Sequence, residues 1–289
     1  MSERMRDVLR IGGCRFGNPV LTASGTFGFG LEFPDVANRL GGVVTKAVTL
    51  EPRIGNSPPR IWEFPGGVIN SVGLENPGIE RFRKGIEPKL RRLRCRVVAN
   101  IAGFAVTEFA RLAEVMEELK GVAAVEVNVS CPNVQEGGAL FGQSPKLVER
   151  ITRAVRRRIR KPVLVKLTAC FVDPLETAKA AEAGGADAVT LINTLFGLVF
   201  DCDGRPVLGG RSGGVSGPAL KPFALFCVDR VAGRIGIPVV GCGGIMNGQD
   251  ARDFLNAGAR MVQVGTASLR NPEAALDVLR ELTQKRRRQ

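Results

Sequence analysis

Two segments decide the fold class: AEAGGADAVT at residues 181–190 and LNAGARMVQV at residues 255–264. In each, a helical pattern ends at glycine and a short loop leads into an apolar strand. Along the chain, eight short apolar runs alternate with longer amphipathic segments. Most runs are continuously apolar, which is typical of strands buried on both faces of a parallel sheet. The alternation predicts an α/β fold, a single (β/α)8 TIM barrel domain over residues 1–289, with a doubly wound open sheet as the competing architecture.

The expected elements follow from these patterns. Strands are expected at residues 19–24, 43–46, 97–101, 123–129, 163–167, 188–192, 238–241 and 260–264. The clearest helical patterns cover residues 79–93, 106–119, 145–159, 174–183, 220–234 and 248–257. Extended segments around residues 60–70 and 200–209 are expected as small insertions at the C-terminal mouth of the barrel.

The composition excludes several kinds of chemistry. The chain has no His and no Tyr, which rules out His-dependent nucleophiles, His metal sites and imidazole proton transfer. A general base must then be Cys, Lys, Asp, Glu or a cofactor group. Lys and Arg total 41 against 28 Asp and Glu, a formal net charge of +13. The basic runs at residues 91–96, 156–161 and 285–288 contain no aromatic residue, so we interpret them as solvated helix ends and expect no nucleic-acid partner.

The seven cysteines are scattered and never form a CxxC pair. This pattern predicts neither a disulfide framework nor a metal site, and favours a reducing, cytoplasmic location. Residues 1–10 are polar and resemble no signal peptide. No later run approaches the roughly 18 apolar residues of a membrane span, so no membrane association is expected.

Polar or glycine residues recur where the expected strands end. In a barrel these ends meet at one mouth, where such enzymes have their active sites. Packing alone does not explain a polar residue at the end of nearly every strand. The set comprises Ser24, Lys46, Asn100, Asn128, Ser130, Cys131, Lys166, Asn193, Thr194, Gly243, Gly244, Gly265 and Thr266.

The last two units carry glycine-rich loops, VVGCGGI at residues 239–245 and VQVGTA at residues 262–267. Backbone N–H groups in such loops bind phosphate, and the loops after the seventh and eighth strands are the usual phosphate site of this barrel. Tight turns that require glycine are the alternative interpretation. Neither a GxGxxG motif nor a P-loop is present, which disfavours a Rossmann dinucleotide site.

Cys131 is the candidate base because it follows a strand exit and begins a glycine-containing segment. We interpret Cys14, Cys95, Cys202, Cys227 and Cys242 as inert buried thiols. Lys46 and Lys166 interrupt apolar runs, where lysine is costly without an anionic partner. The two lysines therefore indicate an anionic cofactor or substrate, although a structural lysine is the alternative for each.

Eight segments, in order, resemble the class 1 dihydroorotate dehydrogenases across nearly the whole chain. The resemblance implies an FMN-containing barrel that oxidises (S)-dihydroorotate to orotate in pyrimidine biosynthesis. The continuation GGALFG, residues 137–142, resembles the class 1B catalytic subunit, which implies a partner subunit carrying FAD and a 2Fe-2S cluster with NAD+ as acceptor. The segments are TASGTFGFG (22–30), TKAVTLEPRIGNSPPR (45–60), INSVGLENPG (69–78), NVSCPNVQEGGALFG (128–142), LINTLFG (191–197), GGVSGPALKP (213–222), GCGGI (241–245) and VGTA (264–267).

The resemblance also implies residue roles. Cys131 matches the base that removes the C5 proton while hydride leaves C6 for flavin N5. Positions matching substrate contacts are Lys46, Asn70, Ser71, Val72, Gly73, Leu74, Asn128, Asn193 and Thr194. Positions matching FMN contacts are Ser24, Lys46, Ala47, Asn100, Asn128, Lys166, Ile192, Gly217, Gly243, Gly244, Gly265 and Thr266.

Three positions depart from the family pattern. Ala47 stands where glycine is expected, and Ala169 and Cys170 replace a Pro-Asn pair. Two other functions stay open on the residues alone. One is an RNA-modifying flavin barrel of the dihydrouridine synthase kind, and the other is a barrel that only binds a phosphorylated ligand. A homodimer is also expected.

Overall fold

The computed structural model describes residues 9–129, 135–136 and 139–284, with the side chains of residues 135–140 outside the description. Eight parallel strands form a closed barrel in which each strand pairs with the next in chain order and β16 closes on β3. This confirms the (β/α)8 prediction. The barrel strands are β3 (Val20–Thr22), β4 (Gly42–Val44), β7 (Arg96–Ile101), β8 (Ala124–Asn128), β11 (Val163–Leu167), β12 (Ala188–Leu191), β15 (Val239–Cys242) and β16 (Met261–Val264).

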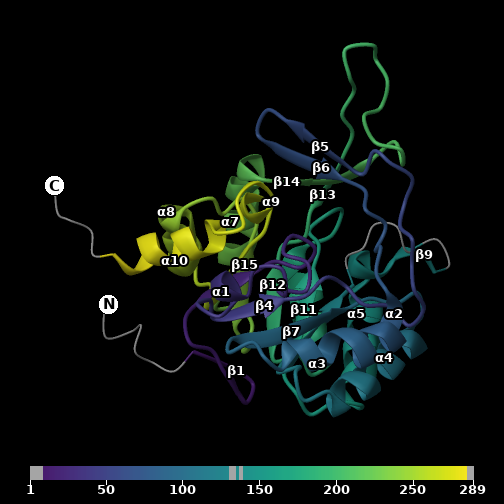
Figure 1. Ribbon diagram of the computed structural model, residues 1–289, viewed down its shortest axis with the longest axis vertical. Helices are drawn as coiled ribbons and strands as arrows, with labels where there is room; N and C mark the ends of the chain where they lie inside the picture. Colours follow the sequence, from purple (N-terminus) through teal and green to yellow (C-terminus); the bar gives the residue numbers. More distant parts are fainter. Residues whose placement is uncertain (1–8, 130–134, 137–138, 285–289) are drawn as a thin grey trace.

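The barrel interior is layered, because alternate side chains of each strand point inward. The layer at the amino ends of the strands is apolar and includes Leu164, Val240 and Met261. A short hairpin, β1 (Arg10–Ile11) with β2 (Cys14–Arg15), adds Ile11 to this layer and closes that end. Figure 1 shows β1 at the end of the barrel opposite the β5–β6 insertion. The open end is therefore the carboxyl end of the strands.

Helices surround the barrel as the apolar periodicity predicts. They are α4 (Val106–Glu118), α5 (Pro145–Arg156), α6 (Pro174–Ala183), α7 (Lys221–Val231) and α8 (Gly248–Asn256). Further helices, not among those predicted, are α1 (Pro34–Ala37), α9 (Thr266–Arg270) and α10 (Ala274–Thr283), with short 3-10 turns at Phe141–Gln143 and Pro218–Leu220.

The helix predicted over residues 79–93 is interrupted. It consists of α2 (Gly78–Arg81), a π-helical turn (Phe82–Ile86) and α3 (Glu87–Leu90). Pro88 lacks the N–H that would bond back to residue 84, so the regular ladder cannot continue through this point. Phe82 and Leu90 nevertheless stay in the core, which is why the apolar periodicity still predicted a helix.

A second, four-stranded sheet lies at the open end (Figure 1). Its strand order is β13 (Leu195–Gly197), β14 (Gly213–Ser216), β6 (Gly67–Asn70) and β5 (Ile61–Phe64). The insertion predicted over residues 60–70 is therefore a hairpin. The insertion predicted over residues 200–209 is the loop between β13 and β14. It doubles back on itself through Val207 N–Val199 O, Asp201 N–Arg205 O and a Phe200–Pro206 bridge, while the paired strands lie on either side of it. A small antiparallel pair, β9 (Gln135–Glu136) with β10 (Ala139–Leu140), follows β8 along the chain.

Two predictions about charge and membranes can be compared with the structure. Arg91 directly follows α3 and Arg156 ends α5, as expected for basic runs at helix ends, and both are paired, with Glu87 and Asp187 respectively. The run at 285–288 lies outside the described residues. Within the described part of the chain, no helix is both long enough and apolar enough to span a membrane.

Asp173 offers a test of how α6 is anchored. Its carboxylate caps the helix by accepting from Leu175 N at 3.0 Å and also accepts from Arg230 Nε at 2.9 Å. We expect Asp173→Ala to lower the free energy of unfolding by about 1 kcal/mol, the usual effect of losing an N-cap. Asp173→Asn keeps a capping oxygen and removes only the exposed ion pair. Its free energy of unfolding should therefore fall by less than about 1 kcal/mol. Urea unfolding at pH 7 measures both.

The pH dependence of this effect has a defined sign. The hydrogen bond from Arg230, with the Leu175 N–H, lowers the pKa of Asp173 from 3.8 to about 2. A depressed pKa stabilises the folded state above the unfolded value and loses that effect as pH falls through the folded value. The stability gap between wild type and Asp173→Asn should therefore narrow between pH 4 and pH 2. A gap that widens there would contradict this account.

Candidate active site

A cavity of about 490 Å³ opens at the carboxyl ends of the barrel strands. Its described charged lining residues are three cations, Lys46, Arg60 and Lys166, and one carboxylate, Glu75. This excess of positive charge suits an anionic ligand. The other described lining residues are Ala23, Ser24, Gly25, Thr26, Gly28, Ala47, Ile61, Asn70, Ser71, Val72, Gly73, Leu74, Asn128, Ile192, Asn193, Thr194, Gly214, Ser216, Leu220, Cys242, Gly243, Gly244, Gly265, Thr266 and Leu269.

The floor of the cavity is polar and buried. Lys166 Nζ lies 2.9 Å from Gln263 Oε1 and 3.2 Å from Cys242 Sγ, and the Lys166 residue is only 3% exposed. Burial alone lowers the pKa of Lys166, but Cys242 and the Glu126 carboxylate oppose it, and the pKa is raised overall. Lys166 is therefore a charged ammonium at the base of the cavity.

One wall is formed by the segment that follows β6. Lys46 Nζ forms an ion pair with Glu75 at 2.5 Å. The next residue, Asn76, is buried and holds this segment in place, because its amide donates to Thr49 Oγ1 at 2.8 Å and to Leu74 O at 2.7 Å. Leu74 adopts a φ of 57°, an uncommon conformation for a branched residue, and the bond from Asn76 maintains it. The wall is thus preformed.

The glycine loops require glycine for two reasons. Gly244 has a φ of +73°, and a Cβ there would lie 2.7 Å from Lys221 Cβ and 2.8 Å from Gly217 O. Lys221 is itself held by Asp250 at 2.5 Å and Asp253 at 2.7 Å. Its charge is therefore already taken, which leaves the backbone N–H groups of the loops as the donors expected for phosphate.

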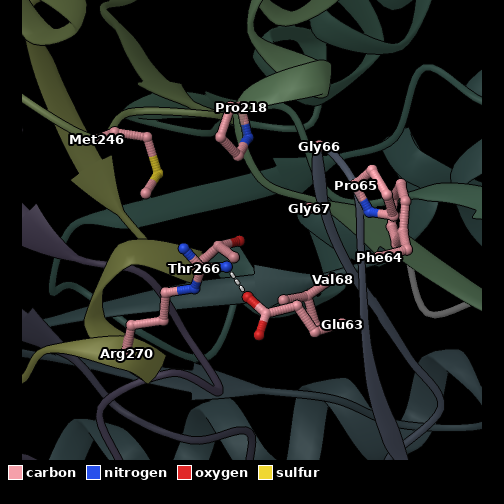
Figure 2. A pocket seen from close by; sticks show the side chains of 10 residues that line it. All are labelled: Glu63, Phe64, Pro65, Gly66, Gly67, Val68, Pro218, Met246, Thr266 and Arg270. Carbon is pink, nitrogen blue, oxygen red and sulfur yellow. Dashed lines mark ion pairs between the residues drawn. The ribbon is translucent and has the colours of Figure 1, made fainter.

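A smaller cavity of about 190 Å³ adjoins this region, and Thr266 lines both. Figure 2 shows Glu63 of β5 and Arg270 of α9 forming an ion pair among the residues that line this cavity. This ion pair ties the second sheet to the helix that follows the last glycine loop. The small cavity thus belongs to the framework around the larger one.

Most predicted site residues meet in the larger cavity: Ser24, Lys46, Ala47, Asn70, Ser71, Val72, Gly73, Leu74, Asn128, Lys166, Ile192, Asn193, Thr194, Gly243, Gly244, Gly265 and Thr266. Asn100 and Gly217 are not among its lining residues. Asn100 is buried one layer below, and Gly217 packs its carbonyl behind Gly244. Cys131 lies outside the described residues, so its role stays a prediction.

Several lining residues were missed by sequence reasoning. Arg60 and Glu75 stand inside quoted motifs, but nothing in their spacing singles them out. Ser216 does not follow a barrel strand, because it belongs to the second sheet, so the pattern of polar strand ends could not identify it. Its Oγ nevertheless accepts a hydrogen bond from Thr266 Oγ1 at 2.9 Å. Ala169 and Cys170 are buried outside the described lining of the cavity.

The cysteines divide into three groups. Burial raises the pKa of Cys227 to about 12, that of Cys95 to about 11 and that of Cys14, as expected for inert thiols, but Cys95 and Cys14 are only half-buried. Cys202 was predicted to be buried but is exposed, because it lies in the loop joining β13 and β14. Cys242 is buried as predicted, yet it lines the cavity beside Lys166 and is not merely a packing group. Among the described residues, no group of three or more Cys, Asp or Glu side chains is arranged to hold a metal ion.

A closed (β/α)8 barrel with a cation-lined cavity at the carboxyl ends of its strands has the architecture of a barrel enzyme. The chain belongs to the dihydroorotate dehydrogenase family, whose sequence profile matches residues 8–285. This confirms the family resemblance inferred from the motifs.

Individual relatives agree. The chain is 48% identical to the dihydroorotate dehydrogenase B (NAD(+)) catalytic subunit of Desulforudis audaxviator, over 97% of this chain and 92% of the relative. It is also 48% identical to the same subunit of Alkaliphilus oremlandii, over 94% and 90% respectively. The crystal structure of the Eimeria tenella DHODH in complex with ferulenol superposes with a TM-score of 0.79 over 98% of this chain and 85% of that chain. At 23% identity, this last likeness concerns the fold.

Proposed function

We propose that this chain is the FMN-dependent catalytic subunit of a class B dihydroorotate dehydrogenase, oxidising (S)-dihydroorotate to orotate in pyrimidine biosynthesis. The observation that carries the proposal is a single cavity that joins Lys46, Asn128 and Asn193 to the two glycine loops. The ammonium suits a carboxylate, and the two amides each offer a donor and an acceptor to a planar cyclic imide. The relatives favour this dehydrogenase over an RNA-modifying flavin barrel.

The residues present fit FMN. Positive charge and unobstructed glycine backbone suit its phosphate, and Lys166 at the cavity floor suits the electron-rich edge of the ring system. In addition, Asn100 Oδ1 is buried without a hydrogen-bond partner among the described residues. A buried acceptor without a donor costs free energy, which a ligand N–H can offset. Lys166 and the polar floor would therefore hold the ring system, and the loops at residues 243–244 and 265–266 would hold the phosphate.

The proposed reaction removes two hydrogens from the substrate ring. Bound FMN supplies the hydride acceptor for C6. Cys131 removes the C5 proton at its sulfur, so that the C5–H electron pair becomes the C5=C6 bond. Lys46, Asn128, Asn193 and Thr194 hold the substrate. Two residues separate Cys131 from Asn128, which lines the cavity, so chain length alone allows their Cα atoms to be at most about 11 Å apart.

The remaining expectations concern partners and location. We propose that electrons pass to NAD+ through a second subunit that carries FAD and a 2Fe-2S cluster, and that this chain also forms a homodimer. The six described cysteines are free thiols, which supports a location in a reducing cytoplasm.

The decisive experiment is anaerobic: dihydroorotate should bleach the flavin of the purified yellow protein. NAD+ with the partner subunit, and fumarate, are then tested separately as acceptors. Retained FMN that dihydropyrimidines do not reduce would instead indicate a phosphate-ligand-binding barrel.

Glu75 should weaken substrate binding, because its carboxylate occupies Lys46 and faces an anionic substrate. Replacing it in Glu75→Gln frees Lys46 and removes the repulsion. We expect the KM for dihydroorotate and the Kd for orotate to fall about three- to fivefold, the range of a half-exposed ion pair. The turnover number should change less than about twofold, since the change affects binding and not the proton transfer.

Glu63→Gln is the matched control. It also removes one carboxylate from an ion pair at the mouth, with Arg270, but Glu63 lines only the smaller cavity. Its KM should stay at the wild-type value. Equal changes in the two variants would show that overall charge, and not the Lys46 contact, governs substrate affinity.

A further inference from the structure

Glu126 lies at the centre of a buried polar layer between the apolar layer of the barrel and the cavity. Its Oε1 accepts from Asn100 Nδ2 at 2.8 Å. Its Oε2 accepts from Thr190 Oγ1 at 3.0 Å and from Gln263 Nε2 at 2.6 Å. The residue is 0% exposed, and it does not line the cavity. Four strands, β7, β8, β12 and β16, thus meet on one carboxylate.

A carboxylate can only accept hydrogen bonds, and this fixes the orientation of its neighbours. Gln263 must turn its NH2 toward Glu126, so its Oε1 faces Lys166 Nζ at 2.9 Å. Asn100 must do the same, so its Oδ1 points away from Glu126. A glutamine at position 126 could both donate and accept hydrogen bonds, so it would not fix the orientation of either neighbouring amide. The negative charge of Glu126 therefore determines that the amide oxygens of Asn100 and Gln263, and not their NH2 groups, face away from it.

The same charge bears on the ionisation of Lys166. An ammonium as buried as this one is unstable without an anion, and isolated buried lysines lose their proton several pH units early. Among the described residues, the titratable groups that act on Lys166 are Cys242 of β15 and Glu126 of β8, and across the cavity lie Lys46 with its partner Glu75, and Arg60. Glu126 is the carboxylate that Gln263 links to Lys166. Removing one partner of such a buried arrangement leaves an uncompensated charge.

We propose that Glu126 is a positioning residue for the cofactor: through Gln263 it keeps Lys166 charged and directed at the cavity floor, and it fixes the orientation of the Asn100 and Gln263 amides. The proposal rests on the proposed FMN function of this cavity. It adds a residue that touches neither substrate nor cofactor but determines what the cavity floor offers to both.

The test measures the FMN dissociation constant of the full chain by fluorescence quenching at pH 7 and pH 9. Wild type should vary less than about threefold, since Lys166 stays protonated throughout. In Glu126→Gln, Lys166 loses its carboxylate partner and should release its proton more readily, so affinity at pH 9 should fall at least about tenfold relative to pH 7. Gln263→Met removes the hydrogen-bonded link, keeps the volume and leaves the Glu126 charge in place. It should show a smaller pH dependence in the same direction and serves if the first variant folds poorly.

Thr190→Val is the control, because it removes one hydrogen bond to Glu126 and leaves its charge. A purely structural role of the layer predicts lower thermal stability and equally weaker FMN binding at both pH values in all three variants. That result, or wild-type FMN affinity in Glu126→Gln, would overturn the proposal. Failure of the proposed function is distinguishable, since wild type would then bind no FMN at either pH.

Discussion

Cys131→Ala should bind FMN as tightly as wild type and be reduced by dihydroorotate about 10²- to 10⁴-fold more slowly at neutral pH, the usual contribution of a general base. The chain contains no His, so no imidazole can take over the proton. Anaerobic stopped-flow measurement of flavin bleaching gives the rate constant directly. In wild type the rate should rise with pH as the thiol, with a free pKa of about 8.5, ionises. The variant should lose this dependence.

Cys202→Ala is the matched control for this experiment. It removes an exposed thiol from the loop that joins β13 and β14 and should leave both FMN content and reduction rate unchanged. If Cys131→Ala is reduced at the wild-type rate, another group is the base. If it loses FMN, Cys131 contributes to the cavity wall and the kinetic result cannot be assigned to proton transfer.

The barrel was predictable because its signals are local. The barrel strands are short apolar runs, and some follow a helix that ends at glycine, as β12 follows Gly184. The five residues Val163–Leu167 carry the strand signal within one run. The break at Phe82–Ile86 was not predicted, because the apolar periodicity continues across Pro88. Strands β13 and β14 were also missed, since both are short and contain glycine, and β14 pairs with β6 more than 100 residues away in the sequence.

The site was predictable only in part, for a related reason. Strand-end residues such as Lys46, Asn128 and Gly244 stand out from the runs they terminate. Glu126 does not stand out, because the sequence does not show which residues surround a single acidic residue in an apolar strand. Those neighbours come together only in the closed barrel. Its partners lie 26, 64 and 137 residues away in the sequence. Only the order of strands around the barrel places them on one carboxylate.

Gly244→Ala should abolish tight FMN binding, with an increase in Kd of at least about 100-fold, equivalent to about 2.7 kcal/mol. Two effects combine. An L-residue at a φ of +73° costs about 1–2 kcal/mol. The new Cβ would also lie 2.8 Å from both Gly217 O and Lys221 N, so the loop that we assign to the phosphate must move. FMN content after purification and fluorescence titration measure the effect.

Gly233→Ala separates these two effects, because Gly233 has a φ of +76° but nothing lies within 4 Å of its added Cβ. It carries the same backbone cost without displacing a loop, so thermal stability should fall slightly while FMN affinity stays within about twofold of wild type. Stability loss shared by both variants then reports backbone strain, and the FMN loss specific to Gly244→Ala reports the phosphate loop. Wild-type FMN affinity in Gly244→Ala would place the phosphate elsewhere, since a clash with fixed backbone atoms cannot be absorbed without moving the N–H groups of this loop.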